Sequence, residues 1–238
     1  MTVLRLFGVR LVLTRSFLAL LALLAVAGLL REAALLFGVV IMHELAHAAA
    51  ARWYGLGVAQ VELLPFGGVA RLEGAIELYP AIEAKVALAG PLSNLAAMAM
   101  ALAAVQAGLL APNAGMLFVE VNALIGGFNL IPALPLDGGR VVRAWLARRV
   151  GIRRATERAA RAGAWCGLAM CAVGLPLAFT GYVSVSMVAV GLFLVVAATR
   201  EEEQAAFAFM RYLARRREEL RLEAGVSARQ IVAGEQTP

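Results

Sequence analysis

The chain has two histidines in 238 residues, and both belong to the motif His43-Glu44-Leu45-Ala46-His47. On a helix, positions 43 and 47 lie one turn apart on the same face, so their imidazole nitrogens can converge on one metal ion. Glu44 lies beside them, where a carboxylate can serve as general base in metal-assisted hydrolysis. The spacing therefore predicts one catalytic Zn2+ ion per chain.

A catalytic zinc site usually needs a third protein ligand. The only aspartate, Asp137, follows Pro135 and precedes Gly138-Gly139, residues that interrupt a helix and permit a tight turn. We expect Asp137 to be the third ligand. Two alternatives stay open: Asp137 also fits an ordinary Asp-Gly turn at the membrane edge, and Glu120 is a competing carboxylate within an apolar segment.

These residues together predict peptide-bond hydrolysis. Zinc lowers the pKa of a water molecule and polarises the scissile carbonyl, while Glu44 takes the proton of that water and returns it to the leaving amine. Asn129 can donate a hydrogen bond to the substrate backbone or to the developing oxyanion. Its alternative role is that of a satisfied polar residue between helices.

The composition indicates an α-helical polytopic membrane protein, because 62% of the residues are hydrophobic and only 16% are charged. A helix needs ~20 apolar residues to cross a bilayer core. Six segments approach this length and predict six transmembrane helices, namely residues 11–30, 33–51, 84–111, 116–132, 162–180 and 182–199.

The segment between the second and third predicted helices has a different pattern. Val58 to Leu64 is strand-like, Pro65-Phe66-Gly67-Gly68 favours a turn, and a second strand-like run begins at Val69. We expect a membrane-associated β-hairpin or re-entrant element, which must border protein or water because bare strand edges are unstable in lipid.

The positive charges predict the orientation in the membrane. Of the 22 Lys and Arg residues, only Arg31 falls in a connection assigned to the outer side. The positive-inside rule then places both termini in the cytosol of a multi-pass cell-membrane protein. The basic connections fit contact with the lipid bilayer, and no nucleic-acid partner is expected.

The chain divides into two parts on this pattern. Residues 1–199 are expected to form a six-span core. Residues 200–238 begin with Arg200-Glu201-Glu202-Glu203 and predict a charged amphipathic helix followed by a short tail in the cytosol.

The motifs resemble those of the intramembrane site-2 protease family of zinc metalloproteases (M50), and within it the branch of stage IV sporulation protein FB. The matching stretches are Met42–His47, Leu63–Gly68, Ala89–Leu92 and Phe128–Gly139. In this resemblance, His43, His47 and Asp137 match the zinc ligands, and Glu44 matches the catalytic glutamate.

The resemblance also implies how substrate is held and what it is. Asn129 and Pro135 match a family motif, and the turn Pro65-Phe66-Gly67-Gly68 matches a loop that positions substrate as an added strand. The implied partner is a membrane-associated protein, namely an inactive sigma-factor precursor released during sporulation by regulated intramembrane proteolysis. Membrane inhibitor proteins are further expected partners.

The chain departs from that branch at its end, where a nucleotide-sensing CBS domain is expected to be absent or truncated. Three functions compete with a pro-sigma protease. An anti-sigma-factor protease is disfavoured because no insertion is long enough for a PDZ domain. A non-catalytic relative has no use for Glu44, and a transporter would need further intramembrane acids or histidines.

Overall fold

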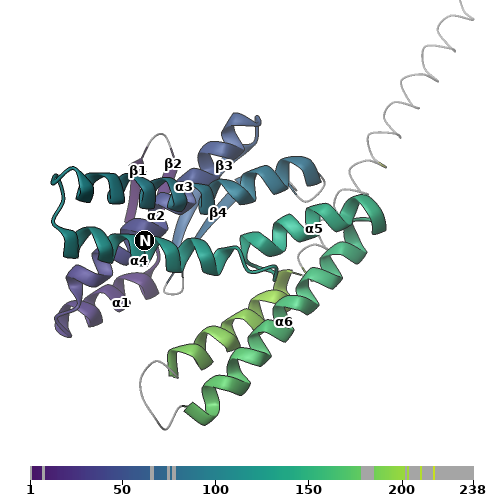
Figure 1. The fold of residues 1–238 in the computed structure, drawn as a ribbon. Coiled ribbons are helices and arrows are strands. Elements are labelled where there is room, and N and C mark those ends of the chain that lie inside the picture. Colours follow the sequence, from purple (N-terminus) through teal and green to yellow (C-terminus); the bar gives the residue numbers. More distant parts are fainter. Residues whose placement is uncertain are drawn as a thin grey trace, which may run out of the picture.

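The computed structural model describes residues 2–6, 9–64, 67–73, 76, 79–177, 185–201, 203, 210 and 217. Most of these residues are helical, and one small sheet lies among the helices of the N-terminal half (Figure 1). The predicted class, a helical protein with a short strand element, is confirmed.

The sheet has four strands in the order β1 (Thr2–Leu6), β2 (Val9–Leu13), β3 (Gly57–Leu64) and β4 (Gly67–Glu73). β1 and β2 pair antiparallel, as do β3 and β4, whereas β2 and β3 run parallel. The predicted hairpin is thus confirmed as β3 and β4, although Pro65 and Phe66 lie outside the described residues.

The sheet is held against the first helices by an apolar core. Leu11 of β2 pairs with Val61 of β3, and both side chains are buried. They join a cluster that includes Phe17 and Phe37, whose rings meet edge to face with centroids 4.7 Å apart. Packing against this core fixes the hairpin beside the helix that carries the histidines.

The described residues also form six named helices, of which the first two pack against the sheet. They are α1 (Arg15–Val26), α2 (Leu30–Trp53), α3 (Pro80–Gln106), α4 (Pro112–Asn129), α5 (Asp137–Val150) and α6 (Ile152–Leu177), and residues 185–201 are also helical. Pro80 and Pro112 occupy the first turns of α3 and α4, where a missing N–H costs no hydrogen bond.

Within the described part of the chain, three helices are long and apolar enough to cross a membrane. These are α2, α3 and α6. The helix α1 has only 12 residues, because residues 11–13 of the predicted first span belong to β2 and the chain turns at residues 27–29 before α2 begins. The predicted connection between the fourth and fifth spans also contains a helix that the sequence did not indicate, α5.

Two segments pack against α6 in the C-terminal half, namely the loop between α4 and α5 and residues 185–201. The loop between α4 and α5 rests on α6, where Leu134 is fully buried and its N–H donates to Ala159 O at 3.3 Å. A Cβ on Gly163 would collide with Leu134 O, so only glycine permits this approach. Residues 185–201 run back along α6, with Gly191 close to Gly167, and the end of this pair that lies far from α5 extends away from the other helices (Figure 1).

Candidate metal centre

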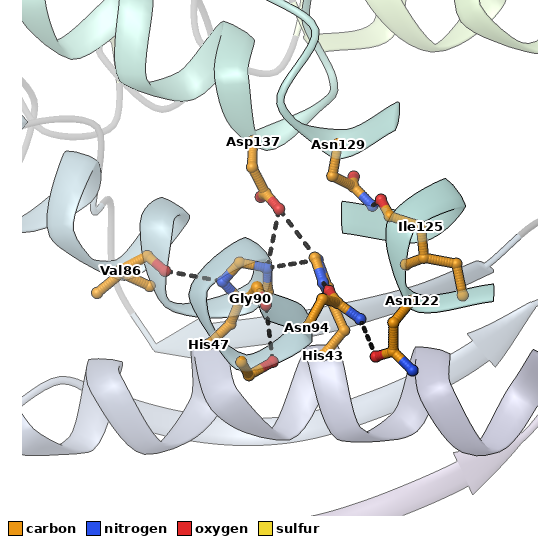
Figure 2. Close-up of polar contacts among 10 residues, drawn as sticks. His43, His47, Val86, Gly90, Asn94, Asn122, Ile125, Asn129 and Asp137 are labelled. Carbon is orange, nitrogen blue, oxygen red and sulfur yellow. Dashed lines mark hydrogen bonds and ion pairs between the residues drawn. The ribbon is translucent and has the colours of Figure 1, made fainter. Parts of the chain in front are cut away.

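Three side chains from two helices converge on one point. His43 and His47 project from α2, and Asp137 begins α5 (Figure 2). The Nε2 atoms of His43 and His47 lie 3.0 and 3.1 Å from Asp137 Oδ2, and 3.1 Å from each other. All three side chains are buried.

The far side of each histidine ring binds an acceptor on α3. His43 Nδ1 lies 2.6 Å from Asn94 Oδ1, and His47 Nδ1 lies 2.7 Å from Val86 O. Asn94 Nδ2 in turn donates to Asn122 Oδ1 at 2.9 Å, which leaves the Asn94 oxygen facing the ring. A carbonyl oxygen only accepts, so Nδ1 carries the proton in both rings.

This pattern directs the lone pairs of both Nε2 atoms toward a carboxylate oxygen. Three facing lone pairs repel one another unless a positive charge lies between them. That charge is either an extra proton on one imidazole ring or a cation bound by all three atoms. Zinc bonds of 2.0–2.1 Å in a tetrahedral site place donor atoms about 3.3 Å apart, close to the separations found here. Two neutral imidazoles and one carboxylate are also the donor types that zinc prefers, so the residues fit the ion.

Asp137 is held in its ionised form. It occupies the first turn of α5, where the helix dipole favours negative charge. Burial alone would raise the pKa of its carboxyl, but the contacts with His43 and His47 and the positive charge of Arg140 hold that pKa well below its usual range. An ionised carboxylate is the form that binds metal.

Glycines permit the backbone to approach the donors. A Cβ on Gly90 of α3 would collide with the Nε2 atoms of both histidines, so α3 can pass the centre only at a glycine. Cβ atoms on Gly138 and Gly139 would meet the backbone of the α4–α5 loop. The Gly-Gly pair after Asp137 thus allows the first turn of α5 to pack under the loop that precedes it.

Glu44 lies beside the centre and is packed against the hairpin. A Cβ on Gly68, the second residue of β4, would collide with the Glu44 side chain. Gly67 has φ +139°, a conformation open to glycine and strained for other residues. Of the two glycines predicted to hold substrate, Gly68 therefore borders the carboxylate predicted to be the general base.

The other predicted residues have these positions. Asn129, at the end of α4, donates from Nδ2 to Ile125 O at 3.0 Å (Figure 2). Pro135 is half-buried in the loop two residues before Asp137. The competing carboxylate Glu120 is exposed on α4, away from the buried donor cluster.

Sequence reasoning missed the residues that orient the histidines. Asn94 and Asn122 are almost fully buried in helices of mainly apolar residues. Polar side chains in such segments were the available signal. The carbonyl of Val86 carried no signal, because every residue has one.

Two buried histidines on a long apolar helix and one buried aspartate from α5 define a metal-binding membrane protein with the donor set of a zinc hydrolase. The chain belongs to peptidase family M50, whose model matches residues 32–111 and 97–174.

Relatives and a solved structure agree with this assignment. Putative zinc metalloprotease Rip3 of Mycobacterium tuberculosis is 41% identical over 180 residues, 72% of this chain and 45% of that protein. Stage IV sporulation protein FB of Bacillus subtilis is 30% identical over 158 residues, 65% of this chain and 55% of that protein. The site-2 protease from Methanocaldococcus jannaschii has a TM-score of 0.62 and 29% identity, covering 84% of this chain and 95% of that one.

The Rip3 protein and zinc metalloprotease MJ0392 of Methanocaldococcus jannaschii are longer than this chain, which spans 45% and 42% of their lengths.

Proposed function

We propose that this chain is an intramembrane zinc endopeptidase that cleaves a membrane-associated protein substrate. His43, His47 and Asp137 are its zinc ligands, and Glu44 is its general base. The observation that carries the proposal is the convergence of three buried donor atoms within 3.0–3.1 Å of one another, next to a glutamate.

The residues divide the chemistry among them. Bound zinc supplies a Lewis acid that polarises the scissile carbonyl and lowers the pKa of water. Glu44 accepts a proton as the water oxygen bonds to the carbonyl carbon, and returns it to the amine as the C–N bond breaks. The Asn129 amide has two N–H donors, of which one binds the Ile125 carbonyl and the other can donate to the substrate backbone.

The hairpin positions the substrate. β4 is the last strand of the sheet, so an extended segment can pair with its outer edge through main-chain hydrogen bonds. Unwinding a helical substrate in this way exposes its peptide bond to attack. The proposed positioning residues are Pro65 and Phe66 between β3 and β4, Gly67 and Gly68 at the start of β4, and Pro135 near Asp137. The contact between Gly68 and Glu44 supports this arrangement.

We further propose six membrane crossings, with both termini in the cytosol of a cell-membrane protein. The crossings use α1, α2, α3, α4, α6 and residues 185–201. α1 alone covers about 18 Å of a bilayer core of about 30 Å, so its crossing includes flanking residues. Residues 1–199 form the protease core and 200–238 a cytosolic segment.

The proposed substrate is a sigma-factor precursor, favoured by the similarity to stage IV sporulation protein FB. Membrane inhibitor proteins are the proposed regulators. An anti-sigma factor is the alternative substrate, and a non-catalytic protein that binds membrane segments is the alternative function.

Co-expression with a panel of membrane-associated pro-proteins, including pro-sigma precursors and anti-sigma factors, tests this proposal. Wild type should cleave a panel member. Glu44→Gln should retain one zinc per chain but not cleave, because it keeps the ligands and loses the base. Asp137→Ala should lose both zinc and cleavage, whereas Glu120→Ala should lose neither. Cleavage by Glu44→Gln would contradict the role of Glu44 as general base. A full zinc content in Asp137→Ala would exclude Asp137 as a ligand.

A further inference from the structure

Two charged side chains outside the proposed mechanism are among the most deeply buried large side chains described. Glu83 of α3 is 2% exposed and Arg143 of α5 is 1% exposed. Arg143 Nε donates to Glu83 Oε1 at 2.9 Å, and Arg143 Nη2 donates to the same oxygen. A buried charge without its partner is strongly destabilising, so each residue holds the other in place.

This ion pair connects the two sides of the metal centre. Glu83 lies one turn before Val86, whose carbonyl accepts the Nδ1 proton of His47. Arg143 lies on the helix that begins with Asp137, about 9 Å further along its axis. α3 therefore orients the histidines, α5 supplies the carboxylate, and the ion pair joins α3 to α5 directly.

A third element reaches the same guanidinium. Glu201, in the helical segment 185–201, places Oε2 3.5 Å from Arg143 Nη1 and Oε1 4.0 Å from Arg140 Nη2. Arg140 lies one turn after Asp137. The helical segment 185–201 is therefore tied to the turn of α5 that presents the proposed metal-binding carboxylate.

We propose that Glu83 and Arg143, extended by Glu201, are positioning residues that hold Asp137 at binding distance from the two histidines. The inference rests on the proposed function, since it takes His43, His47 and Asp137 as zinc ligands. Its physical basis is that metal affinity depends on how firmly outer residues fix the donors.

Zinc dissociation constants of the purified full chain, measured by chelator competition, test the proposal. They are paired with melting temperatures of the metal-free protein. Arg143→Met should weaken zinc binding by about 10- to 100-fold, and Arg143→Lys, which keeps the charge, should recover most of that affinity. Glu201→Gln should cause a smaller loss than Arg143→Met. Arg153→Met is the matched control, because its ion pair with Glu157 is exposed and distant.

A double variant separates positioning from folding. Glu83→Met/Arg143→Met removes both charges, so no unpaired charge stays buried. Its melting temperature should therefore lie closer to that of wild type than the melting temperature of Arg143→Met does. Because the tie between α3 and α5 remains broken, zinc binding should stay at least about 10-fold weaker. A stable double variant with wild-type zinc affinity would overturn the positioning role. A wild-type chain that binds no zinc would instead overturn the proposed function.

Discussion

Both nitrogens of each histidine ring in the metal centre are engaged. One faces Asp137, and the other donates to an acceptor on α3 that fixes the tilt and the tautomer of the ring. Such outer contacts keep an imidazole from rotating away when the metal leaves, so they contribute to affinity without touching the ion.

Asn94 should therefore be important for zinc binding. Asn94→Leu removes the acceptor for His43 Nδ1 and leaves that ring free to turn, and we expect about 10- to 100-fold weaker binding. Asn113→Leu is the control, because Asn113 is an exposed asparagine in the first turn of α4. Chelator competition measures both, and unchanged affinity in Asn94→Leu would contradict the orienting role.

Gly90 should be intolerant of even one added methyl group. In Gly90→Ala the new Cβ would collide with both Nε2 atoms, so α2 and α3 must separate or the rings must turn. We expect loss of stoichiometric zinc, measured by metal analysis of the purified protein. Gly38→Ala, on the same helix as the histidines and with open space around its Cβ, should retain the metal. Full zinc content in Gly90→Ala would show that the helices adjust without cost.

The β3–β4 hairpin should affect catalysis rather than metal binding. In Gly68→Ala the added Cβ would displace the Glu44 side chain and leave the three donors in place. We expect normal zinc content with cleavage reduced by about 10-fold or more, since proton transfer by a positioned base contributes 10²–10⁴-fold. Gly127→Ala, with nothing near its Cβ, is the control. Loss of zinc in Gly68→Ala would show instead that the hairpin contributes to metal binding.

The hairpin and the long helices could be predicted because their signals are local. The turn residues after Leu64 and the apolar run around His43 are each visible within about 20 residues. The strand β2 could not be predicted. Its residues, such as Leu11, are apolar and continue the pattern of a membrane helix, and the pairing partner Val61 lies fifty residues away in the sequence. Tertiary pairing overrode a pattern that favours a membrane helix. Likewise, the spacing of the two histidines contains nothing about Asn94, whose role depends on how α3 packs against α2.

The distribution of arginines predicts which ends of the helices face the cytosol. The last turn of α5 and the first turn of α6 carry four exposed arginines, namely Arg148, Arg149, Arg153 and Arg154, whereas the connection between α3 and α4 has no basic residue. The positive-inside rule places the first on the cytosolic side and the second outside.

Cysteine labelling measures this orientation. In a background with Cys166 and Cys171 replaced by alanine, a cysteine at Asn113 should react with an impermeant maleimide in intact cells. A cysteine at Arg153 should react only after the membrane is opened. Both positions are exposed, so burial does not limit the reaction. Labelling of position 153 in intact cells would reverse the proposed orientation.

The proposed ligands of the metal centre come from helices that are made at different times. Asp137 follows His47 by 90 residues in the chain. A ribosome adding about 5–20 residues per second needs roughly 5 to 18 s to synthesise that stretch. During this interval α2 already exists, and its two imidazoles lack the carboxylate that completes the donor set. If the proposed function holds, the protease is therefore inert while it is being made, and it gains activity against neighbouring proteins only after α5 has been synthesised and has packed against α3.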